Sequence, residues 1–185
     1  MNRNLLILGA GQFGLMAKEI AESMNCFDKI DFLDDNSELA IGTLSDYEKL
    51  VVKYSNAIVA IGNPEIRLSW IQRLGEACYR VIVLVSPSAY VSPSAQLMKG
   101  TIIEPNATVQ ANTTVAIGCI ISSGAVIRHN AFVGDCCHVD CNSVVLSDTI
   151  VPAKTKIPPL TCYAGDISKR RIDETVGNYC FEDGM

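Results

Sequence analysis

The stretch "IISSGAVIRHNAFVGDCCHVDCNSVV", residues 120–145, carries an aliphatic residue at every sixth position. An α-helix repeats about every 3.6 residues and a strand every two, so neither element accounts for this spacing. The same spacing continues in both directions, from Val85 to Ile157, and every position of the series is aliphatic. The residue four places further on in each repeat is small throughout, from Ala89 to Thr161. The sequence therefore contains a long array of hexapeptide repeats.

A large and a small inward residue in every repeat indicate one geometry. Three short strands joined by tight corners make a triangular coil, and stacked coils bury both kinds of residue. Each strand then pairs in parallel with its equivalent one coil away, at about 4.8 Å. The repeat predicts a parallel β-helix over residues 85–165.

The first 84 residues have a different pattern. The run "LLILGAGQFG" leads from an apolar strand into Gly9, Gly11 and Gly14, which open a helix. Further strands are expected at "KIDFLDD" and "NAIVAIGN", with helices around 45–54 and 64–77. Strands that alternate with helices predict an α/β, Rossmann-like domain with a parallel sheet. We expect three segments: this domain over 1–84, the β-helix over 85–165 and a C-terminal tail over 166–185.

Composition excludes several classes of partner. The net charge is −5 with no basic stripe, which argues against nucleic-acid binding. The apolar run "LLIL" is too short for a secretion signal or a membrane span, so we expect a cytoplasmic protein without membrane insertion. Eight cysteines without a secretion signal are then expected to be reduced thiols.

The glycine motif suggests a binding loop. It follows a strand, and Asp34 lies twenty residues after Gly14, the context of a dinucleotide fingerprint. The segment is long enough for only one mononucleotide-binding half, which argues against NAD. The favoured interpretation is an anionic or ribose-bearing ligand at the helix N-terminus, and the alternative is a purely structural glycine turn.

Five segments carry a family resemblance, in this order: "GAGQFGLMAKEI", "FLDD", "IGNPEIRLSWIQRL", "SPSAYVSPSA" and "GAVIRHNAFVGDCCHV". On them the chain resembles the bacterial sugar acyltransferases that include sialic-acid O-acetyltransferases and UDP-amino-sugar N-acetyltransferases. The resemblance implies a left-handed β-helix and a homotrimer with active sites between neighbouring subunits. It also implies an enzyme that transfers an acetyl group from acetyl-CoA to an amino or hydroxyl group of a free or nucleotide-linked sugar.

The resemblance also assigns a set of sugar- and nucleotide-binding residues. Relatives use the glycine loop, an acidic pair and the "IGN" turn, which here correspond to Gly11, Gln12, Phe13, Gly14, Asp34, Asp35, Gly62, Asn63 and Arg67. Phe13 stands where a histidine is common in the amino-sugar enzymes. The alternative for the two aspartates is that they only cap a turn.

The catalytic histidine of the family corresponds to His129, at a corner of the coil. An imidazole, with an ordinary pKa of about 6.5, is suited to act as general base toward a sugar amine or hydroxyl. Relatives often follow this histidine with a carboxylate, whereas this chain has Asn130, which could orient the ring but predicts either a weaker base or an acidic partner from elsewhere in the protein. A glutamate at position 130 would then raise turnover. The alternative is a solvated corner histidine without a role.

Three further residues are assigned to acetyl-CoA by the resemblance. His138 precedes the inward Val139, so it points outward and is expected to donate a hydrogen bond to the acetyl group. Lys169 and Arg170 could meet coenzyme A phosphates. Surface exposure of His138 and a solvated charge run at the lysine and arginine are the alternatives.

The cluster "CCHVDC" suggests a metal site only at first sight. Cys137 falls at a small inward position, while Cys136 and His138 should face outward, so these side chains cannot converge on one ion. We expect no metal. Two other functions remain open: a catalytically weak trimeric scaffold or regulator that binds a nucleotide sugar, and an NAD-dependent oxidoreductase, which lacks a second nucleotide-binding half.

Overall fold

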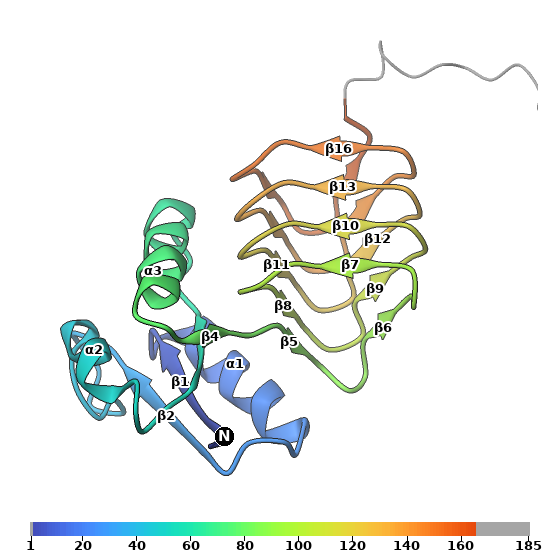
Figure 1. Ribbon diagram of the computed structural model, residues 1–185. Coiled ribbons are helices and arrows are strands. Elements are labelled where there is room, and N and C mark those ends of the chain that lie inside the picture. The colour runs from blue at the N-terminus through green and yellow to red at the C-terminus, as the bar shows by residue number, and fades with distance from the viewer. Residues whose placement is uncertain (1, 166–185) are drawn as a thin grey trace, which may run out of the picture.

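The structure is a computed structural model that describes residues 2–165 (Figure 1). An α/β domain comes first in the chain, and a stack of triangular coils follows it. Within the described residues, no helix has the length and apolar character needed to cross a membrane.

The N-terminal domain is a four-stranded parallel sheet with helices on both faces. Its elements are β1 (Asn4–Leu8), α1 (Gln12–Ser23), β2 (Lys29–Leu33), η1 (Leu44–Asp46), α2 (Tyr47–Leu50), β3 (Asn56–Val59), α3 (Pro64–Glu76) and β4 (Arg80–Val81). The strand order is β2-β1-β3-β4. Side chains of the central β1 alternate between the two faces: Leu5 and Ile7 belong to the core on the α1 side, Leu6 and Leu8 to the core on the α3 side. The Rossmann-like prediction is confirmed.

The helix expected around 45–54 is shorter than the sequence pattern suggested. It consists of a 3₁₀ turn, η1, and a single helical turn, α2, which ends at Leu50. A turn over residues 51–53 follows, and Tyr54 after it is fully buried in the core.

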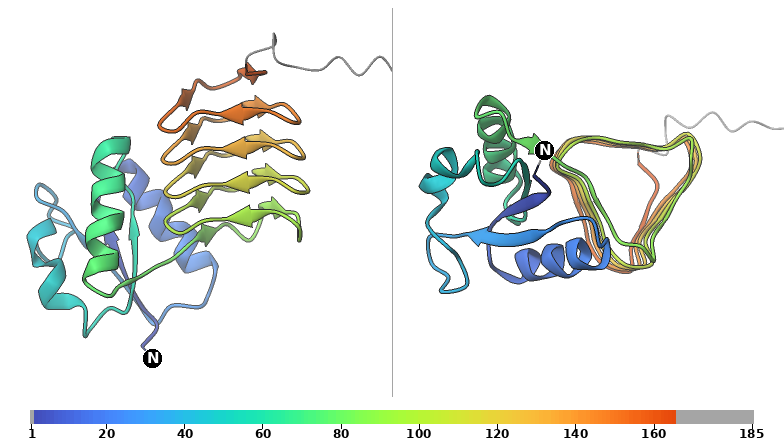
Figure 2. Two further views of the ribbon diagram at one scale, coloured as in Figure 1. Left: turned by 45° about the horizontal axis from the view of Figure 1, so that its top comes forward. Right: turned by 60° about the horizontal axis from the view of Figure 1, so that its bottom comes forward.

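The C-terminal part is a left-handed parallel β-helix, as the hexapeptide repeat and the family resemblance predicted. Figure 2 shows its triangular cross-section, with the coils superimposed along the axis. Each strand pairs in parallel with strands eighteen residues away, as Val126 pairs with Thr108 and Val144. Three sheets result, in the orders β16-β13-β10-β7, β17-β14-β11-β8-β5 and β18-β15-β12-β9-β6.

All strands of the β-helix are two residues long. Their bounds are β5 (Leu84–Val85), β6 (Tyr90–Val91), β7 (Gln96–Leu97), β8 (Ile102–Ile103), β9 (Thr108–Val109), β10 (Thr114–Val115), β11 (Ile120–Ile121), β12 (Val126–Ile127), β13 (Phe132–Val133), β14 (His138–Val139), β15 (Val144–Val145), β16 (Ile150–Val151), β17 (Lys156–Ile157) and β18 (Cys162–Tyr163). The second residue of each strand from β5 to β17 is the aliphatic residue of the hexapeptide. From Ile103 to Ile157 these residues are at most 1% exposed and form one core. Burial stabilises the fold by about 1.5–3 kcal/mol for each such side chain.

The corners of the β-helix impose a second requirement on the sequence. From Gly100 to Leu160, the third residue after each aliphatic position has a φ between 54° and 77°. Side chains other than glycine and asparagine rarely adopt this left-handed conformation. Five of the eleven positions are therefore asparagine or aspartate and three are glycine, and Asn130 is one of them.

The two parts of the chain are joined along helix α3, which packs on the corner between β10 and β11 (Figure 1). A Cβ atom on Gly118 would lie 2.7 Å from Cδ1 of Ile71 and 3.0 Å from Sγ of Cys136, so a side chain at this corner would displace both of these neighbours. On the other side of the sheet, Leu84 and Ile102 of the first coil belong to the same core as α1. The β-helix sheet of β5, β8, β11, β14 and β17 thus faces the N-terminal domain.

Candidate active site

The glycines of the loop between β1 and α1 differ in whether the fold leaves room for a side chain. Gly9 has a φ of 102°, and a Cβ atom on it would lie 2.9 Å from the carbonyl oxygen of Ala60. A Cβ atom on Gly14 would lie 2.1 Å from the carbonyl oxygen of Gly9. A Cβ atom on Gly11, in contrast, would meet no atom within 4 Å. The fold therefore requires glycine at positions 9 and 14 but not at position 11, where the loop borders open space.

The helix that follows this loop begins without a side-chain cap. Gly11 is the N-cap residue of α1, no side chain accepts from its first N–H groups, and its first turn has no acidic residue. Helix α3 differs, because Oδ1 of Asn63 accepts a hydrogen bond from the Ile66 backbone N–H at 2.9 Å. The uncapped N–H groups and the helix dipole make the start of α1 a favourable place for an anion.

Both aspartates after β2 hold the local backbone. Asp34 accepts from the backbone N–H of Ala10 at 2.7 Å and of Asn36 at 2.8 Å, and so fixes the glycine loop. Asp35 accepts from the Leu44 backbone N–H at 2.9 Å. The capping role is thus present, and each carboxyl group still has lone pairs to offer a hydroxyl group.

Phe13 connects the glycine loop to the β-helix. Its ring lies edge-on to the ring of His138, with centroids 5.5 Å apart and an interplanar angle of 83°. A Cβ atom on Gly62 would lie 3.3 Å from Cε2 of Phe13, so the "IGN" turn borders the same ring. Phe13, Gly62 and His138 therefore meet at one place between the two domains.

His138 points outward from β14, yet the N-terminal domain leaves only 12% of its side chain exposed. Its Nε2 atom lies 3.0 Å from Oγ of Ser122 and 3.9 Å from Oδ1 of Asp140. Burial lowers the pKa of His138, and the negative charge of Asp140 opposes that shift. This imidazole is accordingly held neutral and oriented.

The buried carboxylate of Glu104 forms a hydrogen bond with Ser122, the serine that contacts His138. Glu104 is 6% exposed, and its Oε2 atom accepts from the backbone N–H of Ser123 at 2.9 Å and from its hydroxyl at 3.1 Å. Its Oε1 atom accepts from Oγ of Ser122 at 3.4 Å. Sequence reasoning missed Glu104, Ser122 and Asp140. Writing the sequence in coils of eighteen residues would have placed Ser122 beside Glu104 and Asp140.

His129 lies in the exposed turn between β12 and β13. Its Nε2 atom is 3.0 Å from Oγ of Ser147, which belongs to the next coil, and its backbone N–H donates to Oε1 of Gln110 at 3.1 Å. The ring is therefore oriented by Ser147.

Asn130 does not orient the imidazole, contrary to the expectation from sequence. Its Nδ2 atom donates to Oδ1 of Asp148 at 3.1 Å, and its Oδ1 atom accepts from Nδ2 of Asn112 at 3.4 Å. These three residues occupy the left-handed positions of successive coils at one corner. The physical reason for an asparagine here is the backbone conformation.

The two histidines occupy different parts of the coil. His129 follows the sheet that contains β12, whereas His138 lies on the sheet that contains β14, and the aliphatic core fills the space between the sheets. The N-terminal domain packs on the second of these sheets. One chain therefore brings His138 to the glycine loop and leaves His129 at another corner.

Arg67 is not available to a ligand, and its place among the predicted substrate-binding residues is corrected here. Its side chain is fully buried. It donates hydrogen bonds to the carbonyl oxygens of Gly118, Ile61, Gly62 and Cys136, at 2.7, 2.7, 2.9 and 2.8 Å. Arg67 thus fastens α3 and the "IGN" turn to two coils of the β-helix.

The expectations for Cys136 and for the coenzyme A-binding Lys169 and Arg170 have different outcomes. Cys136, expected to face outward, is 1% exposed because α3 covers its corner. Lys169 and Arg170 lie outside the described residues. Within residues 2–165, no group of three or more histidine, cysteine, aspartate or glutamate side chains is placed to hold a metal ion.

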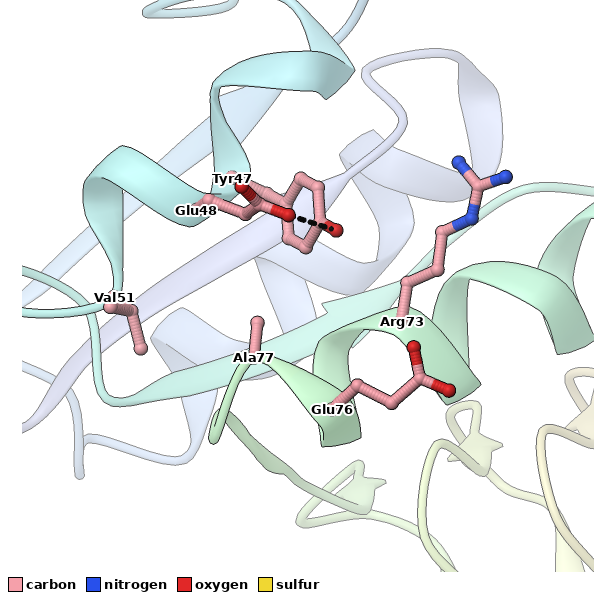
Figure 3. Close-up of a pocket in the computed structure, with 6 residues that line it drawn as sticks. All are labelled: Tyr47, Glu48, Val51, Arg73, Glu76 and Ala77. Carbon is pink, nitrogen blue, oxygen red and sulfur yellow. Dashed lines mark hydrogen bonds between the residues drawn. The ribbon is translucent and has the colours of Figure 1, made fainter.

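A separate surface pocket lies between α2 and α3 (Figure 3). It is lined by Tyr47, Glu48, Val51, Arg73, Glu76 and Ala77, and the Tyr47 hydroxyl donates to Oε1 of Glu48 at 2.9 Å. None of the residues predicted from sequence to bind a ligand lines this pocket.

Comparisons with known proteins agree with this architecture. The family described as the PglD N-terminal domain matches residues 4–74. The acetyltransferase domain of PglB from Neisseria gonorrhoeae FA1090 is 27% identical with a TM-score of 0.70, and the match covers 89% of this chain and 94% of that one. The same domain in complex with acetyl coenzyme A matches at 25% identity with a TM-score of 0.71, over 89% and 95%.

A more distant structure shares the fold. A mutant of perosamine N-acetyltransferase from Caulobacter crescentus, in complex with CoA and GDP-perosamine, is 16% identical with a TM-score of 0.67. The match covers 84% of this chain and 89% of that chain. Together with the N-terminal family match and the hexapeptide coils, the likeness to the PglB domain makes this chain similar in sequence and fold to bacterial sugar acetyltransferases built from hexapeptide repeats.

Proposed function

We propose that the protein transfers an acetyl group from acetyl-CoA to an amino or hydroxyl group of a nucleotide-linked sugar, with His129 as general base. Residues 1–84 would bind the nucleotide sugar, and residues 85–165 would carry the acyl-transfer site. One observation carries the proposal: Phe13 of the glycine loop contacts the ring of His138. A ligand held by the loop would therefore lie beside an imidazole of the β-helix.

The start of α1 supports the nucleotide part of the proposal. Its N–H groups are uncapped, and the open space at Gly11 lets a phosphate approach the backbone. Asp34 and Asp35 lie at the end of the adjacent β2, with lone pairs suited to ribose or sugar hydroxyls. The PglB relative is described with acetyl coenzyme A, and the perosamine enzyme with CoA and GDP-perosamine.

A homotrimer would bring His129 to this ligand from a neighbouring subunit. The turn that holds His129 leads into β13, where Phe132 is 43% exposed and its register neighbour Ile150 on β16 is 69% exposed. Apolar side chains this exposed beside a catalytic candidate favour a subunit contact at this face. The active site would then form between the His129 corner of one subunit and the Phe13–His138 region of the next.

The chemistry needs one base and no covalent enzyme intermediate. His129 would take the proton from the sugar amine or hydroxyl as that atom attacks the thioester carbonyl. The tetrahedral oxyanion would be stabilised by a hydrogen-bond donor, and the coenzyme A thiolate would then leave. Nδ1 of His129 is available for this task when Nε2 donates to Oγ of Ser147, 3.0 Å away.

Release of free thiol from acetyl-CoA tests the proposal directly. The protein is incubated with acetyl-CoA and a panel of sugar nucleotides, and His129→Ala is compared with Arg128→Ala, an exposed neighbour in the same turn. We expect sugar-dependent release by the wild type and by Arg128→Ala, with at least about a hundredfold loss in His129→Ala. Sugar-nucleotide binding without any release would instead support the scaffold, and full activity of His129→Ala would refute its role as base.

A further inference from the structure

The hydrogen bonds around Ser122 determine which ring nitrogen of His138 carries the proton. The Ser122 hydroxyl has one hydrogen and two neighbours able to accept it: Oε1 of Glu104 at 3.4 Å and Nε2 of His138 at 3.0 Å. Among residues 2–165, Ser122 is the only donor to Oε1 of Glu104, whereas Oε2 has two donors from Ser123.

Glu104 is the stronger hydrogen-bond acceptor for the Ser122 hydroxyl hydrogen. Glu104 is 6% exposed, so leaving one of its oxygens without a donor would cost the full desolvation penalty of a charged group. A hydroxyl that donates to a carboxylate also makes a stronger bond than one that donates to a neutral imidazole. Once Ser122 donates to Glu104, its oxygen faces His138 as an acceptor, and Nε2 must carry a hydrogen.

We propose that Glu104, acting through Ser122, holds His138 in the tautomer protonated on Nε2, so that Nδ1 accepts a hydrogen bond from one N–H of an amine acceptor while the other N–H faces His129. Glu104 and Ser122 are therefore positioning residues. A neutral ring with its only proton on Nε2 has none to give at Nδ1, which reverses the donor role expected for His138 from sequence. This inference rests on the proposed function for the identity of the ligand, but not for the tautomer.

Nδ1 is free for this role in the described part of the chain. No hydrogen bond from residues 2–165 reaches it, and 12% of the His138 side chain remains exposed beside its contact with Phe13. The charged groups that act on the ring are Asp140 from its own coil, Lys156 on β17 and Arg67 on α3, and Glu104 reaches it through Ser122. Burial lowers the pKa of His138, so the neutral ring prevails at neutral pH.

Nuclear magnetic resonance of the ¹⁵N-histidine-labelled protein tests the tautomer without substrate. The chain has only two histidines, and His129→Gln assigns their signals. Long-range ¹H–¹⁵N correlations distinguish a protonated Nε2 from a protonated Nδ1. We expect His138 to be protonated on Nε2 in the wild type; protonation on Nδ1 would overturn the inference.

Glu104→Gln should reverse the tautomer. The amide oxygen must stay with the two donors from Ser123, which turns the amide NH₂ toward Ser122. Ser122 would then accept from Gln and donate to Nε2, and the proton of His138 would move to Nδ1. Glu65→Gln, at an exposed glutamate, and Ser147→Ala, beside the other histidine, are the matched controls and should leave His138 unchanged. An unchanged tautomer in a folded Glu104→Gln would also overturn the inference.

Kinetics separate this inference from the proposed function. Glu104→Gln and Ser122→Ala should each lower kcat/KM for the sugar acceptor by about tenfold, the size of one hydrogen bond, while Ser122→Thr keeps the hydroxyl and restores activity. KM for acetyl-CoA should not change, and a change confined to that constant would contradict the acceptor role. Absence of turnover with every sugar would refute the proposed function and leave the tautomer result standing.

Discussion

Replacing Arg67 by methionine tests the junction between the two domains. The guanidinium is fully buried and donates four hydrogen bonds to carbonyl oxygens, two in the "IGN" turn and two in the β-helix. A hydrogen bond to a charged group contributes about 1.5–3 kcal/mol, and burying the cation offsets part of that sum. Methionine fills similar space but leaves the carbonyls without their donor. We expect the free energy of unfolding to fall by about 3–5 kcal/mol, as when one partner of a buried charged network is removed.

Urea denaturation followed by tryptophan fluorescence measures this loss. The only tryptophan, Trp70, lies on the same helix as Arg67 and reports on α3, while far-UV circular dichroism reports on the whole chain. Arg73→Met is the matched control, because Arg73 is on α3 but lies against the Trp70 ring, 4.9 Å from its centroid, at the surface pocket. That contact contributes about 0.5–1 kcal/mol. A loss below about 1 kcal/mol in Arg67→Met, or equal losses in both variants, would refute the account of the junction.

Three further changes test the loop, the corner and the buried imidazole. Gly14→Ala should unfold the N-terminal domain because its Cβ would lie 2.1 Å from a carbonyl oxygen. Gly11→Ala should keep the fold and lose sugar-nucleotide binding in calorimetry. Equal stability of the two variants would contradict the different roles assigned to these glycines. Asn130→Glu should lower the free energy of unfolding by about 1 kcal/mol in thermal unfolding and should lower turnover, because glutamate is strained at a φ of 59° and would face Asp148. Faster turnover in this variant would contradict the corner geometry. Because burial lowers the pKa of His138, the stability of the wild type relative to His138→Gln should be full above about pH 6.5 and decline as pH falls below it, in urea titrations at several pH values. A difference that does not change with pH would show that the ring is not buried as described.

The repeat could be predicted from sequence because one physical rule governs every coil. Each two-residue strand buries its second side chain, so the aliphatic residue recurs without exception from Val85 to Ile157, and the strands follow it. The left-handed corner residues also follow the hexapeptide, but this signal is partly hidden: Cys136, Lys154 and Leu160 occupy positions where asparagine or glycine is expected.

The site was less accessible to sequence reasoning because it depends on contacts between coils and between domains. Ser147 reaches His129 from eighteen residues away, and Ser122 reaches His138 from sixteen. The burial of Arg67 and Cys136 follows from the packing of α3 on the β-helix, which no periodicity in either segment encodes. Asn130 was interpreted as a partner of His129 from its neighbour in sequence, whereas its side chain serves the corner.

Activity of hybrid oligomers tests the central claim most directly, namely that His129 of one subunit acts beside the Phe13–His138 region of another. His129→Ala and His138→Ala are prepared separately, each is shown to retain no more than about a tenth of the wild-type rate, and they are then co-expressed so that subunits mix. The account predicts that hybrids regain acetyl-CoA-dependent thiol release at about a quarter of the wild-type rate, since random mixing leaves about one site in four with both histidines. Hybrids that remain inactive would contradict a site shared between subunits.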